Sequence, residues 1–252
     1  MFSNARRMNP NNETAHQNAR FAVRFSPAIG SPWWDFGSRW LGQCAFTGET
    51  FVQHVIEHLP NALHERLTAG PRRHGWHATL KAPFELARGI NTAILEHGVD
   101  AIALMWHPTV IPSFRVEIFK DILALVPATP CAAVDAIAGA CVTGLHPYSA
   151  PLPPENLRRC RASGLTARED ALLLRWRHPF VLDQFCFHLP LTSSLRGVTP
   201  LQVKALIDAA QHAVEDLPAC VFDAISLFKE PAPGENFIFL SRFELSSNLD
   251  VI

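Results

Sequence analysis

Two short segments of this chain share one pattern, in which apolar residues alternate with polar ones and a histidine stands on the polar side. They read Trp-His-Ala-Thr-Leu-Lys at 76–81 and Phe-His-Leu-Pro-Leu-Thr at 187–192. Alternation of this kind predicts a strand with one buried face. Two such strands, far apart in the chain and each carrying a histidine, predict a duplicated fold with one histidine in each half.

The polar face of each strand carries the candidate functional side chains. Successive residues of a strand point to opposite faces, so His77, Thr79 and Lys81 share one face, and His188 and Thr192 share the corresponding face of the second segment. Two histidines can serve as a base and an acid near neutral pH, and a hydroxyl close by can donate to a phosphoryl oxygen. We therefore expect a pair that cleaves a cyclic phosphodiester with no metal and no other cofactor.

The overall composition favours a folded chain that binds a small anion. The 252 residues are 48% hydrophobic and 18% charged, which is enough to bury a substantial core in one large domain or two fused lobes. The formal net charge is −1, so no global positive field would hold a long polyanion by counterion release. We expect a small phosphorylated substrate as the partner, and no DNA.

Cysteine usage and hydropathy predict the compartment. The six cysteines are scattered without a Cys-x-x-Cys pair, and the N-terminal residues lack the apolar core of a secretion signal. No apolar run approaches the roughly 20 residues that span a bilayer. We expect a cytoplasmic protein with reduced thiols and no membrane partner.

The first half of the chain predicts alternating strands and helices. Residues 1–19 are rich in Asn, Arg and Gln and predict a flexible tail. A strand at 20–26 carries Arg24, which we place on a cleft face. The expected elements that follow are a packed loop or short helix at 31–50, a helix at 60–69 closed by Gly70-Pro71, the first histidine strand, a helix at 91–105, and a hairpin of strands 114–119 and 122–126 that completes the sheet of the first lobe.

The second half predicts a helical insert and then a second lobe. The expected helices of the insert are 131–143, 154–162 and 166–176, the last opened by a capping box and followed by packing residues at 176–178. A histidine strand at 181–192, a helix at 199–214 and strands near 221–229 and 236–245 follow. The predicted organisation is α+β, with a tail at 1–19, a first lobe at 20–129, a helical insert at 130–180 and a second lobe at 181–252.

Longer blocks of sequence carry a resemblance to a known family. They are Phe-Gly-Ser-Arg-Trp-Leu-Gly at 36–42, Pro-Arg-Arg at 71–73, His-Ala-Thr-Leu-Lys-Ala-Pro-Phe at 77–84 and Phe-His-Leu at 187–189. From about residue 20 to 245 the chain resembles the two-histidine (2H) phosphoesterases, and among them the branch of phosphonate-metabolism proteins. The resemblance implies a bilobal α+β fold in which two antiparallel sheets line a central cleft, with helices outside and a helical insert between the lobes. It implies cyclic phosphate esters as substrates, including a phosphoribosyl cyclic phosphate of phosphonate catabolism.

The resemblance also implies roles for single residues. His77 and Thr79 match the first motif of the family, and His188 matches the histidine of the second. Pro190 stands where the family has threonine, and it has neither a hydroxyl nor a backbone N–H. Proline within a strand favours an edge or a bulge, and a bulge would bring Thr192 inward as a substitute donor.

Three cations complete the expected site. Lys81 and Arg24 are expected to face the substrate, and Lys229 stands late in a strand where relatives carry a basic residue that would contact phosphate. The family often has a tyrosine where this chain has His74.

Three functions remain open at this point. The first is a metal-independent cyclic phosphodiesterase that acts on a small sugar or nucleotide cyclic phosphate, with His77 and His188 as the acid–base pair. The second is a non-catalytic binder of a phosphorylated ligand, which Pro190 motivates. The third is an enzyme that processes RNA ends with a 2′,3′-cyclic phosphate; the near-neutral charge and the lack of a basic patch interleaved with aromatics count against it.

Overall fold

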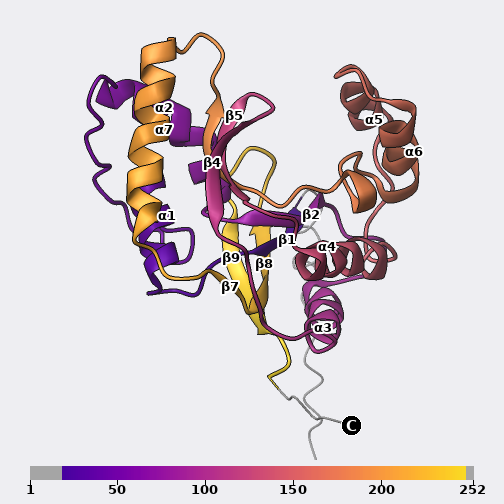
Figure 1. Ribbon diagram of the computed structural model, residues 1–252. Coiled ribbons are helices and arrows are strands. Elements are labelled where there is room, and N and C mark those ends of the chain that lie inside the picture. The colour runs from indigo at the N-terminus through magenta and orange to yellow at the C-terminus, as the bar shows by residue number, and fades with distance from the viewer. Residues whose placement is uncertain (1–18, 248–252) are drawn as a thin grey trace, which may run out of the picture.

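The computed structural model describes residues 19–247, and its strands form three antiparallel sheets. One sheet has the order β2-β1-β8-β9, another the order β4-β5-β6, and a short ribbon pairs β3 with β7 (Figure 1). The predicted α+β class is therefore confirmed. The tail predicted at 1–19 lies outside the described residues, apart from Ala19, which is buried.

Most predicted elements exist close to their predicted positions. The strands are β1 Arg20–Phe25, β2 Ala78–Phe84, β3 Thr109–Val110, β4 Phe114–Phe119, β5 Ile122–Pro127, β6 Leu189–Ser194, β7 Val221–Phe222, β8 Ala224–Glu230 and β9 Ile238–Glu244. The helices are α1 Pro32–Leu41, α2 Asn61–His74, α3 Thr92–Ala103, α4 Ala132–Gly144, α5 Pro154–Arg161, α6 Ala167–Trp176 and α7 Pro200–Glu215.

The two larger sheets exchange strands between the halves of the chain, which corrects the predicted lobes. The sequence pattern places the β4–β5 hairpin in the sheet of the first histidine strand, but β5 pairs with β6. The first histidine strand, β2, instead shares a sheet with the C-terminal strands β8 and β9. The ranges 20–129 and 181–252 therefore do not form separate sheets. Alternation along a strand predicts its buried face, whereas the partner strand depends on the long-range fold.

Helix α2 continues five residues beyond its predicted end at position 69, through Gly70 and Pro71 to His74. It packs against β6. A Cβ atom at Gly70 would lie 2.5 Å from the hydroxyl oxygen of Ser193, so glycine permits this close approach. Packing on the sheet thus outweighs the backbone hydrogen bond that Pro71 cannot make, and the helix ends instead at Gly75, whose φ is 78°.

The second histidine strand is shorter than the predicted range 181–192. Residues Leu182–Gln184 form a 3₁₀ turn, and β6 begins only after His188. Pro190 lies in a strand at the edge of its sheet, and the register of β5 and β6 shifts between Ile122 and Ala124. The edge position and the bulge predicted from Pro190 are both confirmed.

The helices cover the outer faces of the two sheets. Helices α2 and α7 pack on the three-stranded sheet, whereas α3 and α4 pack on the four-stranded sheet. Helices α5 and α6 of the predicted insert lie apart from both sheets (Figure 1). Within residues 19–247, no helix has the length and apolar character needed to cross a bilayer.

Candidate active site

His77 and His188 occupy matching positions, because each immediately precedes a strand, β2 and β6 respectively. Their rings are also held alike. The Nδ1 atom of His77 lies 2.7 Å from the carbonyl oxygen of Gly75, and that of His188 lies 2.8 Å from the carbonyl oxygen of Cys186. A carbonyl oxygen only accepts, so each Nδ1 carries a proton and donates it. Each neutral ring therefore keeps a lone pair on Nε2, the atom left for chemistry.

Thr79 connects His77 to a cavity that His188 also lines. The hydroxyl of Thr79 lies 3.1 Å from Nε2 of His77, and it donates to that lone pair. Thr79 and His188 both line a cavity of about 520 Å³. The ring of His188 packs against that of Phe119, with the centroids 4.7 Å apart. The structure therefore brings His77, Thr79 and His188 together, as the sequence predicts.

A row of polar side chains crosses the four-stranded sheet beside His77. Thr79 of β2, Arg24 of β1 and Ser226 of β8 are direct cross-strand partners, so their side chains share one face. Arg24 is only 1% exposed, and its Nη1 donates to the carbonyl oxygen of His74 at 2.5 Å. Its guanidinium also lies 4.1 Å from the ring centroid of Phe237. Arg24 thus lies on the same sheet face as Thr79, in a buried position.

Three buried polar atoms in this part of the sheet have no hydrogen-bond partner among the described residues. They are Nε of Arg24 and the hydroxyl oxygens of Ser26 and Ser226. Buried polar atoms without partners are costly, and these three belong to residues that do not line the cavity shared by Thr79 and His188. Sequence reasoning missed Ser226, because only the strand register places it beside Arg24.

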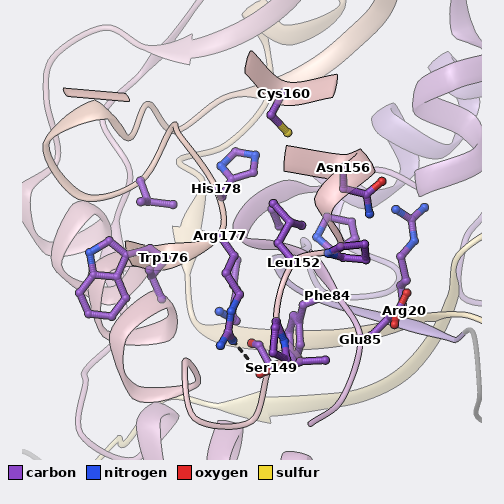
Figure 2. Close-up of a pocket in the computed structure, with 18 of the residues that line it drawn as sticks. Arg20, Phe84, Glu85, Ser149, Leu152, Asn156, Cys160, Trp176, Arg177 and His178 are labelled. Atoms are coloured by element: carbon purple, nitrogen blue, oxygen red, sulfur yellow. Dashed lines mark hydrogen bonds between the residues drawn. The ribbon is translucent and has the colours of Figure 1, made fainter. Parts of the chain in front are cut away.

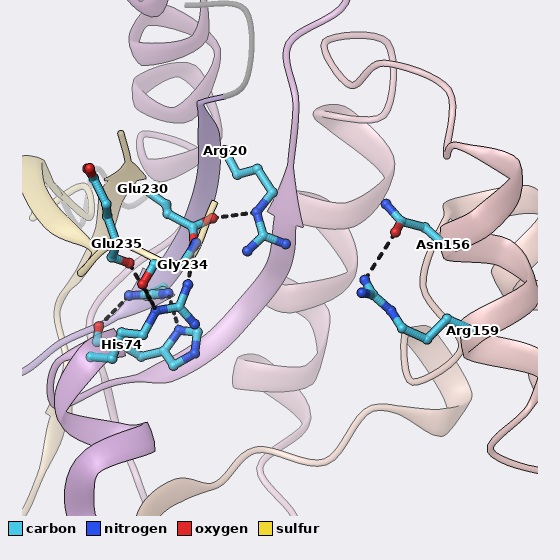
Figure 3. Close-up of polar contacts among 9 residues, drawn as sticks. Arg20, His74, Asn156, Arg159, Glu230, Gly234 and Glu235 are labelled. Atoms are coloured by element: carbon cyan, nitrogen blue, oxygen red, sulfur yellow. Dashed lines mark hydrogen bonds and ion pairs between the residues drawn. The ribbon is translucent and has the colours of Figure 1, made fainter. Parts of the chain in front are cut away.

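A buried carboxylate balances the charge of this region. Glu230 is fully buried and forms ion pairs with Arg20 and Arg73 (Figure 3), and it accepts the backbone N–H of Gly234 at 2.9 Å. Burial lowers the pKa of Arg24 to about 9, while the charge of Glu230 opposes that shift. Arg24 therefore stays cationic at neutral pH.

The environment keeps both histidines neutral at neutral pH. Burial, and then the charges of Arg24 and His74, hold the pKa of His77 well below its ordinary value. Burial also lowers the pKa of His188, although its bond to Cys186 raises it. A bound anion would favour the charged form of either ring.

Two predicted site residues lie elsewhere because of how the strands pair. Lys229 is the direct partner of Phe21, on the face of the sheet opposite Arg24. The β1–β2 register shifts between Val23 and Arg24, so the alternation that would place Lys81 beside Thr79 is broken. Lys81 lines a different cavity. Neither lysine therefore lies on the sheet face that carries Thr79 and Arg24.

Thr192 has a structural role in place of the predicted one. Its hydroxyl oxygen accepts the backbone N–H of Leu123 at 2.9 Å, and the residue is 1% exposed. This bond takes the place of a backbone hydrogen bond between β5 and β6, at the point where the bulge of β6 shifts their register. Thr192 therefore does not stand in for the hydroxyl that Pro190 lacks. His74 stacks on Phe237, with 4.9 Å between the centroids, and its ring is 6.0 Å from that of His77.

Comparison with known proteins adds one family and two relatives. A family model described as "Protein of unknown function (DUF1045)" matches residues 79–238. Two curated relatives share the name "Ribose 1,5-bisphosphate phosphokinase PhnN". The one from Janthinobacterium sp. (strain Marseille) is 36% identical over 231 residues, covering 90% of this chain and 51% of the relative. The one from Laribacter hongkongensis (strain HLHK9) is 33% identical over 221 residues, covering 86% and 50%. This chain thus spans about half the length of the curated relatives it matches.

Solved phosphoesterase structures are also similar, at a low level. E. coli LigT complexed with 3'-AMP aligns with a TM-score of 0.38 and 11% identity, covering 91% of this chain and 99% of that one. A structure described as a phosphoesterase aligns with the same TM-score and 9% identity, covering 90% and 98%. Similarity at this level carries no argument about function.

Proposed function

This chain belongs to the family described as Protein of unknown function (DUF1045), and we propose that it is a metal-independent 2H-type cyclic phosphodiesterase. The substrate is a small sugar or nucleotide cyclic phosphate. One observation carries the proposal: two histidines, each immediately before a strand, use Nδ1 in the same backbone bond, which leaves Nε2 of each ring for chemistry once the attacking water displaces the hydroxyl of Thr79 from Nε2 of His77. A base and an acid of this kind are what hydrolysis of a cyclic phosphodiester requires.

The charges around the rings favour one assignment of roles. His77 lies beside the cationic Arg24, which keeps it neutral, so it is the base that accepts a proton from the attacking water. Burial and then the charge of Lys120 lower the pKa of His188, its bond to Cys186 raises it, and the bound anion would raise it further, so we assign His188 as the acid. The water oxygen bonds to phosphorus, the bond from phosphorus to one ring oxygen breaks, and His188 protonates that oxygen. The buried cation of Arg24 would favour the anionic substrate from its place beside His77, although it does not line the cavity itself.

The names of the relatives suggest the sugar. Hydrolysis of a 5-phosphoribosyl 1,2-cyclic phosphate at the bond between the 2-oxygen and phosphorus yields ribose 1,5-bisphosphate, the compound in those names. We assign this chain to that opening step, in line with the phosphonate catabolism that the family resemblance implies. The named kinase activity is not assigned to this chain, since it contains no Gly-Lys pair and so no P-loop of the Gly-Lys-Ser/Thr type. All six cysteines are free thiols, which suits a cytoplasmic setting.

The test follows hydrolysis of the ribose cyclic phosphate by ³¹P NMR with and without EDTA. EDTA should have no effect, and His77→Ala and His188→Ala should each lower kcat by about 10²–10⁴-fold. His97→Ala, at an exposed position of α3, is the control and should retain full activity. Full activity in either active-site variant would remove the acid–base pair.

A second candidate, a binder without catalysis, has one observation in its favour. Thr79 bonds to the ring of His77, whereas Pro190, two residues after His188, has no hydroxyl to offer. For a binder, a nucleoside monophosphate would bind without turnover of its cyclic form, and Pro190→Thr would introduce cleavage. An RNA that ends in a 2′,3′-cyclic phosphate, assayed beside the ribose cyclic phosphate, tests the RNA-processing alternative. Faster hydrolysis of the RNA would favour that alternative.

A further inference from the structure

A second cavity lies close to the histidine cavity, along the edge of β2. It has a volume of about 220 Å³, and it is lined by β2, by residues 149–153, by α5 and by residues 176–178 (Figure 2). Four residues line both cavities, namely Ala82, Pro83, His178 and Val181. Since β2 is an edge strand, no further strand separates the two cavities. The two cavities therefore adjoin at the open edge of β2.

Lys81 is the residue of this cavity that most needs a ligand. The residue is only 5% exposed, and among the described residues its amino group, which is not itself fully buried, forms neither a hydrogen bond nor an ion pair. The centroid of the Phe84 ring lies 4.9 Å from Nζ. Lysine is almost never this buried without a partner, because an unpaired ammonium is costly to remove from water. The missing partner is an anion.

Two neighbours add donors that the fold holds in place. Arg177 adopts a left-handed backbone conformation, with φ at 66°, and its Nη1 donates to the carbonyl oxygen of Ser149 at 2.6 Å. Few non-glycine residues adopt that conformation, so the surroundings must stabilise it. His178 accepts the backbone N–H of Phe180 on Nδ1, at 3.3 Å. Its neutral ring therefore carries the proton on Nε2, which is free to donate.

The charge of the wall matches an anionic ligand. The cationic side chains that line it are Arg20, Lys81, Arg159 and Arg177, against the single carboxylate of Glu85. Arg20 is paired with Glu230, but the other three cations have no carboxylate partner among the described residues. A small anion with several acceptor oxygens, such as a phosphate monoester, fits this wall better than an apolar group does.

We propose that this cavity binds a second phosphate of the substrate, with Lys81 as its principal ligand. The inference rests on the proposed function and assigns a binding site to the 5-phosphate of the substrate proposed there. It gives the helical insert a role, since α5 and residues 176–178 form one wall of the cavity. Arg177 and His178, interpreted from the sequence as packing residues, become part of a binding site.

The first experiment compares two substrates, ribose 1,2-cyclic phosphate with and without a 5-phosphate. The intact protein should show at least a tenfold lower KM for the 5-phosphorylated compound. In Lys81→Met this ratio of KM values should fall to about one, and kcat should change less than KM. Lys229→Met is the matched control, on the same sheet but outside both cavities, and should keep the ratio. A full ratio in Lys81→Met overturns the proposal.

The second experiment measures binding and needs no turnover. Calorimetry should show that ribose 5-phosphate binds the intact protein and a His77→Ala/His188→Ala variant with similar affinity, and Lys81→Met at least tenfold more weakly. That pattern supports the site even if no cyclic phosphate is hydrolysed, so the two proposals fail separately. Equal binding by Lys81→Met overturns the site. Ribose 5-phosphate should inhibit hydrolysis competitively; non-competitive inhibition would mark a separate effector and overturn the assignment to the substrate.

Discussion

Replacement of Lys81 by methionine should stabilise the unliganded protein, because the lysine is buried without a partner. Burial lowers the pKa of Lys81 from 10.5 to about 8, with the charge of Arg177 adding to the shift. At about 1.36 kcal/mol per pKa unit, the charged form costs about 3 kcal/mol of folding free energy at pH 7. Methionine retains an unbranched stem of similar length and carries no charge. Lys81→Met should therefore raise the free energy of unfolding by up to about 3 kcal/mol.

The dependence on pH separates this effect from a change in packing. Because the folded-state pKa is below the unfolded one, the cost is complete below pH 8 and disappears as the pH rises through 10.5. The advantage of Lys81→Met should fall to about 1.5 kcal/mol at pH 9.5. Urea unfolding at pH 7 and pH 9.5 measures it, with Lys229→Met as the control. A less stable Lys81→Met, or a gain that is the same at both values, would refute the argument that the charge is buried without a partner.

Three further changes test the fold and the site. Burial lowers the pKa of His64 to about 4, so this residue alone should contribute about 2 kcal/mol of the stability lost between pH 7.5 and pH 5, as the unfolded state takes up a proton; urea unfolding should show that His64→Phe reduces the loss by that amount. The rest of the loss comes from other buried histidines, such as His74 and His178, and should persist in the variant. Gly37→Ala would place a Cβ atom 2.0 Å from the ring of Trp76 and should lower the free energy of unfolding by about 3 kcal/mol. Gly139→Ala lies in a helix, where the added Cβ atom would be 3.6 Å from its nearest neighbour, and should raise that free energy by about 0.5 kcal/mol. Equal melting temperatures for the two variants would contradict this packing. Thr79→Val should lower kcat about 10²-fold. Thr192→Val should keep kcat and lower the free energy of unfolding by about 1–2 kcal/mol. A loss of kcat in Thr192→Val but not in Thr79→Val would show that Thr192, and not Thr79, is the catalytic hydroxyl.

Local sequence signals account for most of the elements. The capping box predicted at Thr166 is present, with both reciprocal bonds to Glu169, and α6 begins directly after it. The hairpin around Lys120 and Asp121 is present because alternating strands flank a short turn. These features need only contacts between residues that are near in sequence, and such contacts are what a sequence pattern encodes.

The errors arise where distant segments meet. Helix α2 passes through Pro71 because β6 lies against it, and the pairing of the β4–β5 hairpin depends on which strand arrives beside it. Lys81 is misplaced by one register shift, because a single extra residue in a strand interrupts the alternation of side chains. No pattern within 76–81 reveals that shift.

The amino-acid sequence by itself determined which residues could do chemistry, since two matching strands with a histidine at the same position are visible in the letters alone. It determined the elements too, because caps and alternation act over a few residues. Only the tertiary structure decided which of the polar residues gather around the histidines. It joined Arg24 to Ser226, turned Lys81 and Lys229 away, and used the hydroxyl of Thr192 in a bulge. The physical reason is that cross-strand register, which sets both face and neighbour, is a property of pairs of distant segments.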